Sequence, residues 1–308
     1  VMLVDVQCVF PALSSMANYF HTKVISTSPK AKFPGAEHIE FKEKEAMTIA
    51  KKIIRIAIDN FPNRKKEKIC IPSNKMDLVA GFTAENVFYN LGGRFRPSYR
   101  PLNDAVITGR IRGAVGIVGC NTPRIKQDFG HVEMAKELLK NDVLVVVTGC
   151  SAIADAKAGL LTPESAFEYA GKGLQEVCRA VGIPPVLHFG SCVDISRILV
   201  VLCNVVKEGG LGEDICDIPV AAAAPEWMSE KAVAIAFYAI ASGIFTVLGV
   251  PFPVLGSKQL NELLTDKIEK LVGAKFAFEG DPIKAARLIL DHLNKKRENL
   301  KLKPMMYT

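Results

Sequence analysis

The chain has 308 residues, of which 49% are hydrophobic, and its formal net charge at pH 7 is +7. This length and apolar content suit one large or two modest globular domains with a sizeable core, and exclude a disordered chain. Basic residues alternate with acids, as in "KEKE" and "NKKRENLKLK", and do not cluster beside aromatic residues, so we expect solvated helix faces and no nucleic-acid partner.

The first sixty residues predict two strands and two helices. These elements cover residues 2–7 (strand), 11–20 (helix), 23–27 (strand) and 42–59 (helix). In the last of them, Ile49, Ile53 and Ala57 recur at the spacing of an amphipathic helix. The segment "NFPNRKKEK" then ends the helix with a proline and a charge run, and we place a domain boundary between residues 61 and 62.

Beyond that boundary, strands and helices alternate with little interruption. The predicted strands cover residues 68–72, 114–119, 143–148, 186–190, 218–223 and 244–249. The predicted helices cover residues 75–90, 131–140, 163–180, 194–207, 229–241, 257–272 and 281–296. Continuous apolar strands separated by helices are typical of a parallel sheet covered on both faces, so we predict a doubly wound, Rossmann-like α/β fold. "NLGGRFRPSYRPLND" lacks the ending of a phosphate-binding loop and predicts a surface connection.

Nothing in the sequence predicts a signal peptide or a membrane span. The most apolar stretch, "AVAIAFYAIASGIFTVLGVPF", contains glycine and proline and predicts a buried helix followed by a buried strand. Eight cysteines in a chain without secretory features indicate a reducing cytoplasm and argue against a disulfide framework. Thiolate chemistry or metal ligation is therefore the question that the cysteines raise.

Four cysteines each follow an apolar segment that predicts a strand: "VMLVDVQC", "AVGIVGC", "VLVVVTGC" and "VLHFGSC". They are Cys8, Cys120, Cys150 and Cys192. Parallel strands end at one edge of a sheet, and ligands bind in the crevice outside that edge, so these thiols can converge. Four soft anionic ligands suit an iron-sulfur cluster or zinc, although each cysteine taken singly also fits a structural role.

The remaining cysteines and two histidines carry weaker signals. We expect small buried hydrophobic residues at four positions: Cys70, Cys178, Cys203 and Cys216. His131 begins a predicted helix and His188 lies in a predicted strand, and we expect both to form structural hydrogen bonds and not to bind metal.

Four segments together resemble the carboxyl-terminal half of nickel-containing, anaerobic carbon monoxide dehydrogenase, over almost the entire chain. They are "VDVQC", "GIVGCNTPRIKQDFGHVEMAKELLKNDVLVVVTGC", "LHFGSCVDISRI" and "PEWMSEKAVAI". The resemblance implies the end of a middle Rossmann-like domain over residues 1–61 and a complete carboxyl-terminal Rossmann-like domain over residues 62–308. It also implies an oxidoreductase that interconverts CO and water with CO2, two protons and two electrons at a nickel-iron-sulfur cluster. Cys8, Cys120 and Cys150 would bind iron, and Cys192 would bind nickel.

Lys231 lies in the first turn of a predicted helix, after Ser229 as the expected N-cap, where the helix dipole opposes a positive charge. The resemblance makes Lys231 the cation that stabilises the bound carboxylate oxygen and assists proton movement. Ile235, one turn later, would help to shape the gas-binding pocket.

The chain has no methionine at position 1 and begins inside a predicted strand, so we expect a piece of a longer polypeptide. The resemblance places a further histidine and cysteine ligand, and additional iron-sulfur clusters, upstream of residue 1. It implies a homodimer, an electron carrier such as ferredoxin and, in some enzymes, an acetyl-CoA synthase partner. We therefore expect the isolated chain to be inactive and to retain its cluster weakly.

Two other functions compete with this interpretation. One is a hybrid-cluster-type iron-sulfur reductase without nickel, and the other is a noncatalytic α/β module with structural thiols. The segment "PEWMSEKA" favours the dehydrogenase.

Overall fold

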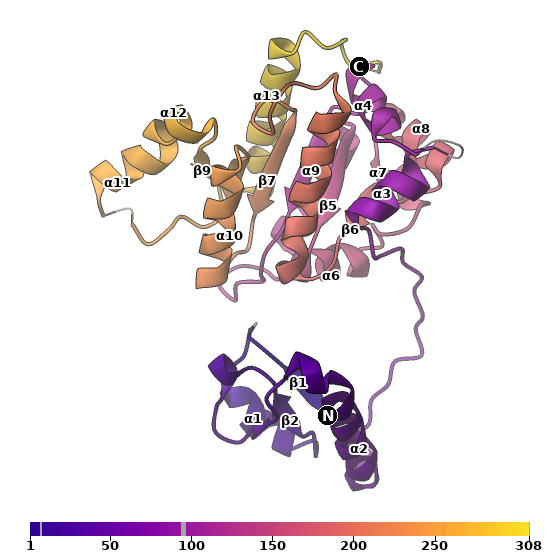
Figure 1. Cartoon of the computed structure of the whole chain (residues 1–308), viewed down its shortest axis with the longest axis vertical. Helices are drawn as coiled ribbons and strands as arrows, with labels where there is room; N and C mark the ends of the chain where they lie inside the picture. The colour runs from indigo at the N-terminus through magenta and orange to yellow at the C-terminus, as the bar shows by residue number, and fades with distance from the viewer. Residues whose placement is uncertain (7, 94–96, 255, 308) are drawn as a thin grey trace. The chain divides into compact units, whose positions relative to one another are not determined.

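The computed structural model describes residues 1–6, 8–93, 97–254 and 256–307, in two compact units, Val1–Lys75 and Met76–Thr308 (Figure 1). The expected boundary at residues 61 and 62 precedes this division, because the segment after Asn63 extends to Lys75 before the second unit begins. The assignment of the two parts to a middle and a carboxyl-terminal domain stays a prediction.

The first unit has a small parallel sheet of order β1-β2-β3, formed by β1 (Met2–Val4), β2 (Val24–Ser26) and β3 (Glu37–His38). Its helices are α1 (Ala12–Asn18) and α2 (Ala46–Asn60). The apolar stripe of α2 packs Ile49 against Ile25 and Ile39, which form the core of this unit. The predicted strand over residues 2–7 ends at Val4, so it is shorter than expected.

The second unit contains a six-stranded parallel sheet of order β6-β5-β4-β7-β8-β9. Its strands are β4 (Gly113–Ile117), β5 (Val143–Val147), β6 (Val186–His188), β7 (Val220–Ala224), β8 (Phe245–Leu248) and β9 (Phe276–Phe278). Every residue of β5 is buried, as expected for a strand that is covered on both faces. The predicted parallel, doubly wound α/β fold is therefore confirmed.

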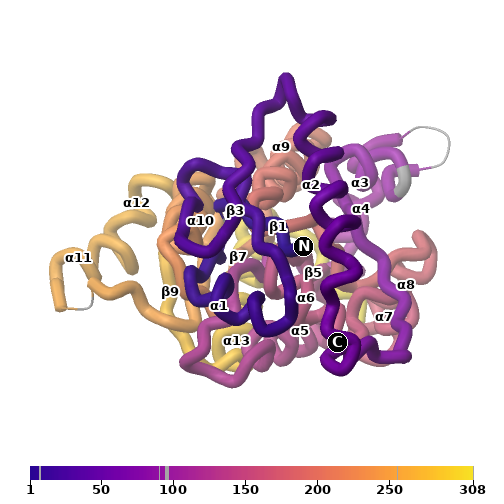
Figure 2. Tube along the Cα trace, turned by 90° about the horizontal axis from the view of Figure 1, so that it is seen from below, coloured from indigo at the N-terminus to yellow at the C-terminus, as the bar shows by residue number. Residues whose placement is uncertain are grey.

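Helices cover both faces of this sheet (Figure 1). On one side, α5 (Phe129–Lys140) packs against α13 (Pro282–Asn299) and α6 (Gly149–Lys157). On the other lie α9 (Ser196–Glu208) and α10 (Glu230–Ala241), with α3 (Ala84–Leu91) and α4 (Arg100–Ile107) against α9. The connection from β5 to β6 also contains α7 (Ser165–Tyr169) and α8 (Lys172–Val181). Beyond β9 and α10 lie α11 (Lys258–Glu262) and α12 (Glu269–Val272), as Figures 1 and 2 show.

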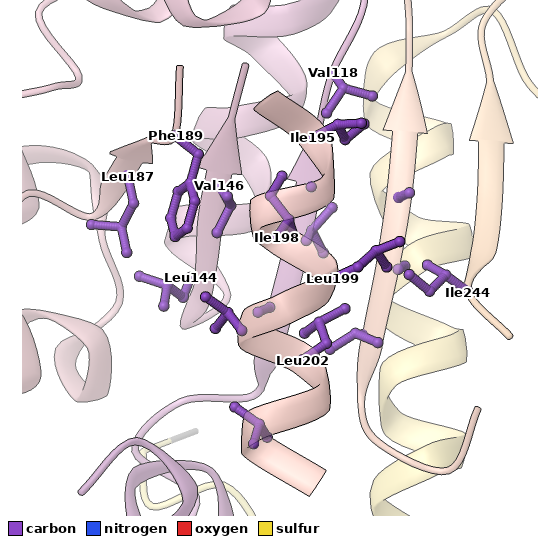
Figure 3. Close-up of a pocket in the computed structure, with 18 of the residues that line it drawn as sticks. Val118, Leu144, Val146, Leu187, Phe189, Ile195, Ile198, Leu199, Leu202 and Ile244 are labelled. Carbon is purple, nitrogen blue, oxygen red and sulfur yellow. The ribbon is translucent and has the colours of Figure 1, made fainter. Parts of the chain in front are cut away.

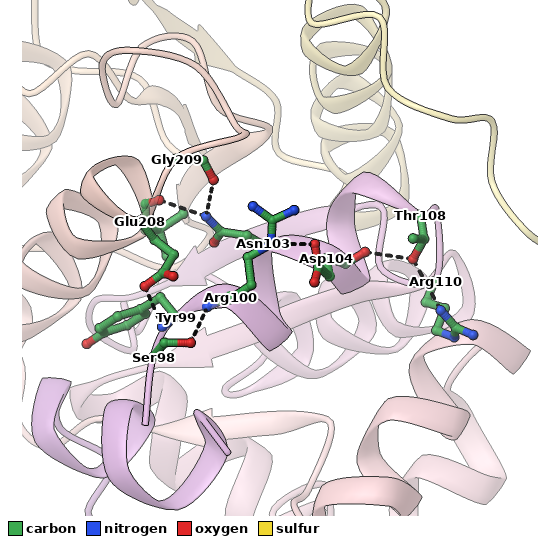
Figure 4. A network of polar contacts seen from close by, with 10 residues as sticks. Ser98, Tyr99, Arg100, Asn103, Asp104, Thr108, Arg110, Glu208 and Gly209 are labelled. Atoms are coloured by element: carbon green, nitrogen blue, oxygen red, sulfur yellow. Dashed lines mark hydrogen bonds and ion pairs between the residues drawn. The ribbon is translucent and has the colours of Figure 1, made fainter. Parts of the chain in front are cut away.

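Polar contacts fasten α4 to the end of α9 (Figure 4). The backbone N–H of Tyr99 donates to Glu208 at 2.9 Å. The side-chain amide of Asn103, which is fully buried, donates to the carbonyl oxygens of Val205 and Gly209, each at 2.9 Å. These bonds satisfy carbonyl groups that the end of α9 leaves without a helical partner, and so they fix α4 over the sheet.

Several predicted elements are wrong. Residues 69–83 contain neither helix nor strand, so the strand at 68–72 does not form, and the helix at 75–90 is reduced to α3. The predicted helix at 163–180 breaks into α7 and α8 at Gly171, which contacts the Asp142 carboxylate closely enough to exclude a side chain. The expected surface connection before residue 108 includes α4, although its residues 94–96 lie outside the described residues.

Candidate metal centre

The strand order changes direction between β4 and β7. The strands β5 and β6 follow β4 toward one edge of the sheet, and β8 and β9 follow β7 toward the other edge. The loops that leave β4 and β7 lead to α5 and α10 on opposite faces of the sheet, and open α/β sheets bind ligands at such a point.

Three of the four predicted cysteine ligands lie at the carboxyl ends of neighbouring strands. Cys120 follows β4, Cys150 lies in the first turn of α6 after β5, and Cys192 opens a short 3-10 helix after β6. The Cys192 sulfur lies against Gly149, so closely that a methyl group on Gly149 would overlap it. Adjacent strands thus bring Cys150 and Cys192 to one part of the edge, with Cys120 on the next strand.

Within the described residues, no three His, Cys, Asp or Glu side chains are grouped as they would be around a single metal ion. A cluster of several metals is larger, and its thiolate ligands bind different metals, so it needs more widely spaced sulfurs. The three cysteines therefore stay candidate ligands of a cluster.

Cys8 belongs to the first unit. It lies beyond the end of β1, is exposed and has a left-handed backbone φ of 49°. Its participation in a site with the other three cysteines stays a prediction.

Lys231 lies in the first turn of α10, with its ammonium nitrogen buried and without a hydrogen-bond partner among the described residues. Ser229 is the N-cap of this helix, as expected, but its hydroxyl does not cap it. The Ser229 hydroxyl lies 3.9 Å from the Cys120 sulfur instead. Burial of an unpaired ammonium is costly, so this position calls for an anionic partner.

An apolar cavity of about 180 Å³ lies between the sheet and helices α9 and α10 (Figure 3). Its wall includes Ile235 and, in Figure 3, Val118, Leu144, Val146, Leu187, Phe189, Ile195, Ile198, Leu199, Leu202 and Ile244. Cys120, Cys192, Lys231 and Thr148 also line it. The cavity is thus apolar along the sheet, and the thiols of Cys120 and Cys192 and the ammonium group of Lys231 line it at the cysteine edge.

The two histidines form hydrogen bonds with the backbone. His131 is fully buried, and its Nε2 lies 2.8 Å from the carbonyl oxygen of Cys120. Because a carbonyl only accepts, Nε2 carries the proton, and burial lowers the pKa of this imidazole. His188 Nδ1 accepts from the Gly190 N–H at 3.0 Å, and burial lowers its pKa as well.

The other cysteines only partly match expectation. Cys178 is buried, and burial raises the pKa of its thiol to about 12, which makes it inert. Cys216 is half-buried. The expectation of burial is wrong for Cys70 and Cys203, because Cys70 lies in the exposed segment at the end of the first unit and Cys203 is exposed on α9.

Comparison with known proteins identifies the family. Residues 1–283 match the Prismane/CO dehydrogenase family. The chain belongs to this family. It is 54% identical over 98% of its length to carbon monoxide dehydrogenase 1 of Methanosarcina mazei, and 42% identical over 97% to carbon monoxide dehydrogenase 1 of Carboxydothermus hydrogenoformans. It covers 47% and 48% of these two relatives, so it spans about half their length.

Solved structures of the family share the fold. The Ni-free carbon monoxide dehydrogenase from Thermococcus sp. AM4 is 50% identical with a TM-score of 0.90, and this chain covers 46% of it. Carbon monoxide dehydrogenase IV from Carboxydothermus hydrogenoformans is 45% identical with a TM-score of 0.91, and 49% of it is covered. Each match covers 98% of the present chain. The resemblance of the sequence to the carboxyl-terminal half of carbon monoxide dehydrogenase is therefore confirmed.

Sequence reasoning missed one buried acidic residue of this family member. Glu226 is fully buried two residues after the end of β7, and it accepts hydrogen bonds from the side-chain amide of Asn121 and the backbone N–H of Gly130. A carboxylate that closely follows an apolar strand was a usable signal, but its partners lie about a hundred positions away in the sequence.

Proposed function

We propose that this chain is the metal-binding region of an oxidoreductase that interconverts CO and water with CO2, two protons and two electrons at a nickel-iron-sulfur cluster. Family membership supports this assignment. The observation that carries it is the buried ammonium of Lys231, which has no hydrogen-bond partner among the described residues and lines the same cavity as Cys120 and Cys192. A cation placed among soft thiolate ligands and apolar walls fits an anionic cluster and a substrate that gains negative charge.

We assign Cys8, Cys120 and Cys150 to iron and Cys192 to nickel. Thiolates are the ligands that iron-sulfur clusters and nickel in sulfur-rich sites prefer. When bound, such a cluster supplies a soft metal for the carbon of CO and a Lewis acid that activates water. The hydrogen bond from His131 holds the Cys120 carbonyl oxygen, and Gly149 leaves room for the Cys192 sulfur.

Lys231 supplies positive charge where negative charge develops. Its ammonium group is already desolvated, so its attraction to a carboxylate oxygen is stronger than it would be in water. The three N–H bonds of the ammonium group also allow Lys231 to give a proton to an adjacent oxygen and to take one back.

The cavity wall selects for a small apolar substrate. Ile235 and the aliphatic side chains of α9 exclude water and ions from the space beside Lys231. CO is small and nearly apolar, and enters such a space at little cost in desolvation.

We propose the partners that the family suggests: a homodimer, an electron carrier such as ferredoxin and, in one branch, acetyl-CoA synthase. One relative, 41% identical, is the carbon monoxide dehydrogenase/acetyl-CoA synthase subunit beta of Moorella thermoacetica. Among the described residues, no helix has the length and apolarity that a bilayer crossing requires. We place the protein in the cytoplasm.

The test uses the full polypeptide that the gene encodes, produced without oxygen and with nickel and iron. We expect nickel and iron in the purified protein and CO-dependent reduction of a viologen dye. Lys231→Ala should lower the rate about 100- to 1000-fold while the metal content stays the same. Lys172→Ala, which removes an exposed lysine from the first turn of α8, is the matched control and should leave the rate unchanged.

Three results would contradict the proposal. Iron without nickel would favour a hybrid-cluster-type reductase, and a colourless protein would favour a noncatalytic module. Equal rates for Lys231→Ala and the parent would remove the role of the ammonium group.

A further inference from the structure

Hydrogen bonds join the turn between β7 and α10 to the loop that follows β4, at the point where the strand order changes direction. We propose that Glu226, in this turn, is a positioning residue that sets the place of Cys120 relative to Lys231. The inference rests on the proposed function and assigns a role to a side chain that lies outside the ligand set.

The Glu226 carboxylate is fully buried and accepts three hydrogen bonds. One oxygen accepts from the Asn121 side-chain amide at 2.8 Å and from the Asp128 N–H at 3.2 Å. The other oxygen accepts from the Gly130 N–H at 2.9 Å. The backbone carbonyl of Glu226 accepts from the Thr122 N–H at 3.0 Å, so Glu226 contacts both residues that follow Cys120.

Glu226 supplies the N-terminal cap that α5 lacks in its own sequence. Asp128 is the N-cap residue, but its φ is 69° and its side chain forms no cap. The carboxylate from the β7 turn takes that place, where exposed N–H groups and the helix dipole favour a negative charge. Gly130 permits the approach, since a Cβ there would lie 2.9 Å from Pro225. His131, the next residue, holds the Cys120 carbonyl.

The network continues to the helix that carries Cys150. The Asn121 amide also donates to the Asp128 carboxylate at 3.0 Å, and so it bridges the carboxylates of Asp128 and Glu226. Asp128 forms an ion pair with Lys157 near the end of α6. The buried charge of Glu226 is therefore held by donors from the β4 loop and α5, with a cation from α6 one step away.

Lys231 follows Glu226 by only five positions in the chain. Ser229 lies 3.9 Å from the Cys120 sulfur, and Lys231 follows in the first turn of α10. Because Glu226 fixes both the Cys120 loop and the turn that leads to Lys231, loss of its carboxylate should shift the thiol and the ammonium group relative to one another. Displacements of about 1 Å in a catalytic site cost on the order of 100-fold in rate.

The test compares Glu226→Gln with Asp142→Asn. Asp142 is also a buried carboxylate, 5% exposed, that accepts from a backbone N–H at a helix start, Leu174 of α8 at 2.8 Å. It precedes β5 and therefore lies at the opposite edge of the sheet. Asp142→Asn removes a similar cap and leaves the cysteine edge in place. Asn121→Ala, which keeps the carboxylate and removes one of its donors, serves if Glu226→Gln does not fold.

Two measurements decide the role. In the full gene-encoded polypeptide loaded with metal, Glu226→Gln should lower kcat for CO oxidation about 10- to 100-fold, alter the electron paramagnetic resonance spectrum of the cluster, and leave KM for CO nearly unchanged. In the metal-free protein, mass spectrometry should show faster alkylation of Cys120 in Glu226→Gln than in the parent. Asp142→Asn should match the parent in both.

The proposal is overturned if Glu226→Gln and Asp142→Asn behave alike in alkylation and in the cluster spectrum, because Glu226 would then be only a helix cap. The alkylation measurement requires neither metal nor CO. It therefore decides the positioning role even where the parent does not oxidise CO, a result that would count against the proposed function alone.

Discussion

Three polar side chains near the cysteine edge are buried without a hydrogen-bond partner in the described part of the chain: Thr148, Asp155 and Lys231. Thr148 and Lys231 line the apolar cavity, so a bound group can reach them. Asp155 does not line it and is enclosed by protein. Thr148 and Lys231 are therefore candidates to bind a ligand, whereas the surrounding protein must stabilise Asp155.

Burial raises the pKa of Asp155 well above its ordinary value of 3.8, and the nearby negative charge of Asp128 adds to the effect, while Lys136 opposes it. The acid is protonated in the folded state over a range in which the unfolded chain has lost its proton. The contribution of Asp155 to the free energy of unfolding is complete below pH 3.8, and it is lost as the pH rises through the pKa that Asp155 has in the folded state. Asp155→Asn should remove this loss, which is at most about 1.4 kcal/mol per pH unit.

Thermal or urea unfolding of the metal-free protein at a series of pH values from 3.8 upward measures this effect. The free energy of unfolding of the parent should fall relative to that of Asp155→Asn as the pH increases. Asp291→Asn, at an exposed position on α13, keeps Asp155, so its free energy of unfolding should change with pH as that of the parent does. Parallel curves for the parent and Asp155→Asn would show that Asp155 finds a partner that keeps it charged.

The positions of individual candidate residues in the fold were predictable from sequence when the signal was local, while their roles in a site stay predictions. Lys231 stood out because it lies in a first helical turn, and Cys120, Cys150 and Cys192 because each follows an apolar strand. Glu226 was missed because its partners are supplied by tertiary contacts. Ser229 occupies the expected N-cap position, but its hydroxyl lies near the Cys120 sulfur, and this proximity is also a tertiary property.

At the level of elements, buried strands were predicted best. The apolar runs that form β4, β5, β7 and β8 have no competing structure, because their side chains are covered on both faces. The wrong strand at 68–72 has alternating Ile69 and Ile71, but both are exposed, and the segment pairs with no described strand. The start of α3 was misplaced although Thr83 signals it, with a hydroxyl that accepts from Asn86.

The junction of β5 and α6 gives a prediction at this scale. Gly149 has a φ of +65°, and a methyl group there would overlap the Cys192 sulfur. Gly149→Ala adds left-handed strain of about 1–2 kcal/mol and also displaces the proposed nickel ligand. In the metal-loaded enzyme we expect nickel to fall relative to iron, with a matching loss of CO oxidation.

Gly159→Ala is the matched control for this change. Gly159 follows the other end of α6 with a φ of +77°, and nothing lies within 4 Å of a Cβ placed there. Both variants should lose stability through left-handed strain, and Gly149→Ala somewhat more because its methyl group overlaps the Cys192 sulfur, but only Gly149→Ala should lose nickel. A normal nickel-to-iron ratio in Gly149→Ala would show that Cys192 does not bind nickel.

At the scale of the whole molecule, the two units have separate cores. The first is built around Ile25, Ile39 and Ile49, and the second contains all six strands of the large sheet. Local sequence patterns predicted that a boundary exists, from the proline and charge run after α2. They did not predict where the second unit begins, because Val79 and Gly81 are tied to it by backbone hydrogen bonds to Leu161 and His188, which no local pattern reveals.

This division predicts how a protease cuts the metal-free chain. The segment from Ile69 to Gly81 has no helix or strand and is exposed throughout, and Lys68 and Lys75 offer trypsin two exposed sites there. Backbone without regular structure fits a protease active site, whereas the sheet must first unfold. Brief digestion should therefore release Met76–Thr308 as a persistent fragment, identified by its mass. Because that fragment keeps its own core, it should unfold cooperatively. If the protease degrades the fragment as fast as it degrades the intact chain, the two units depend on each other for stability.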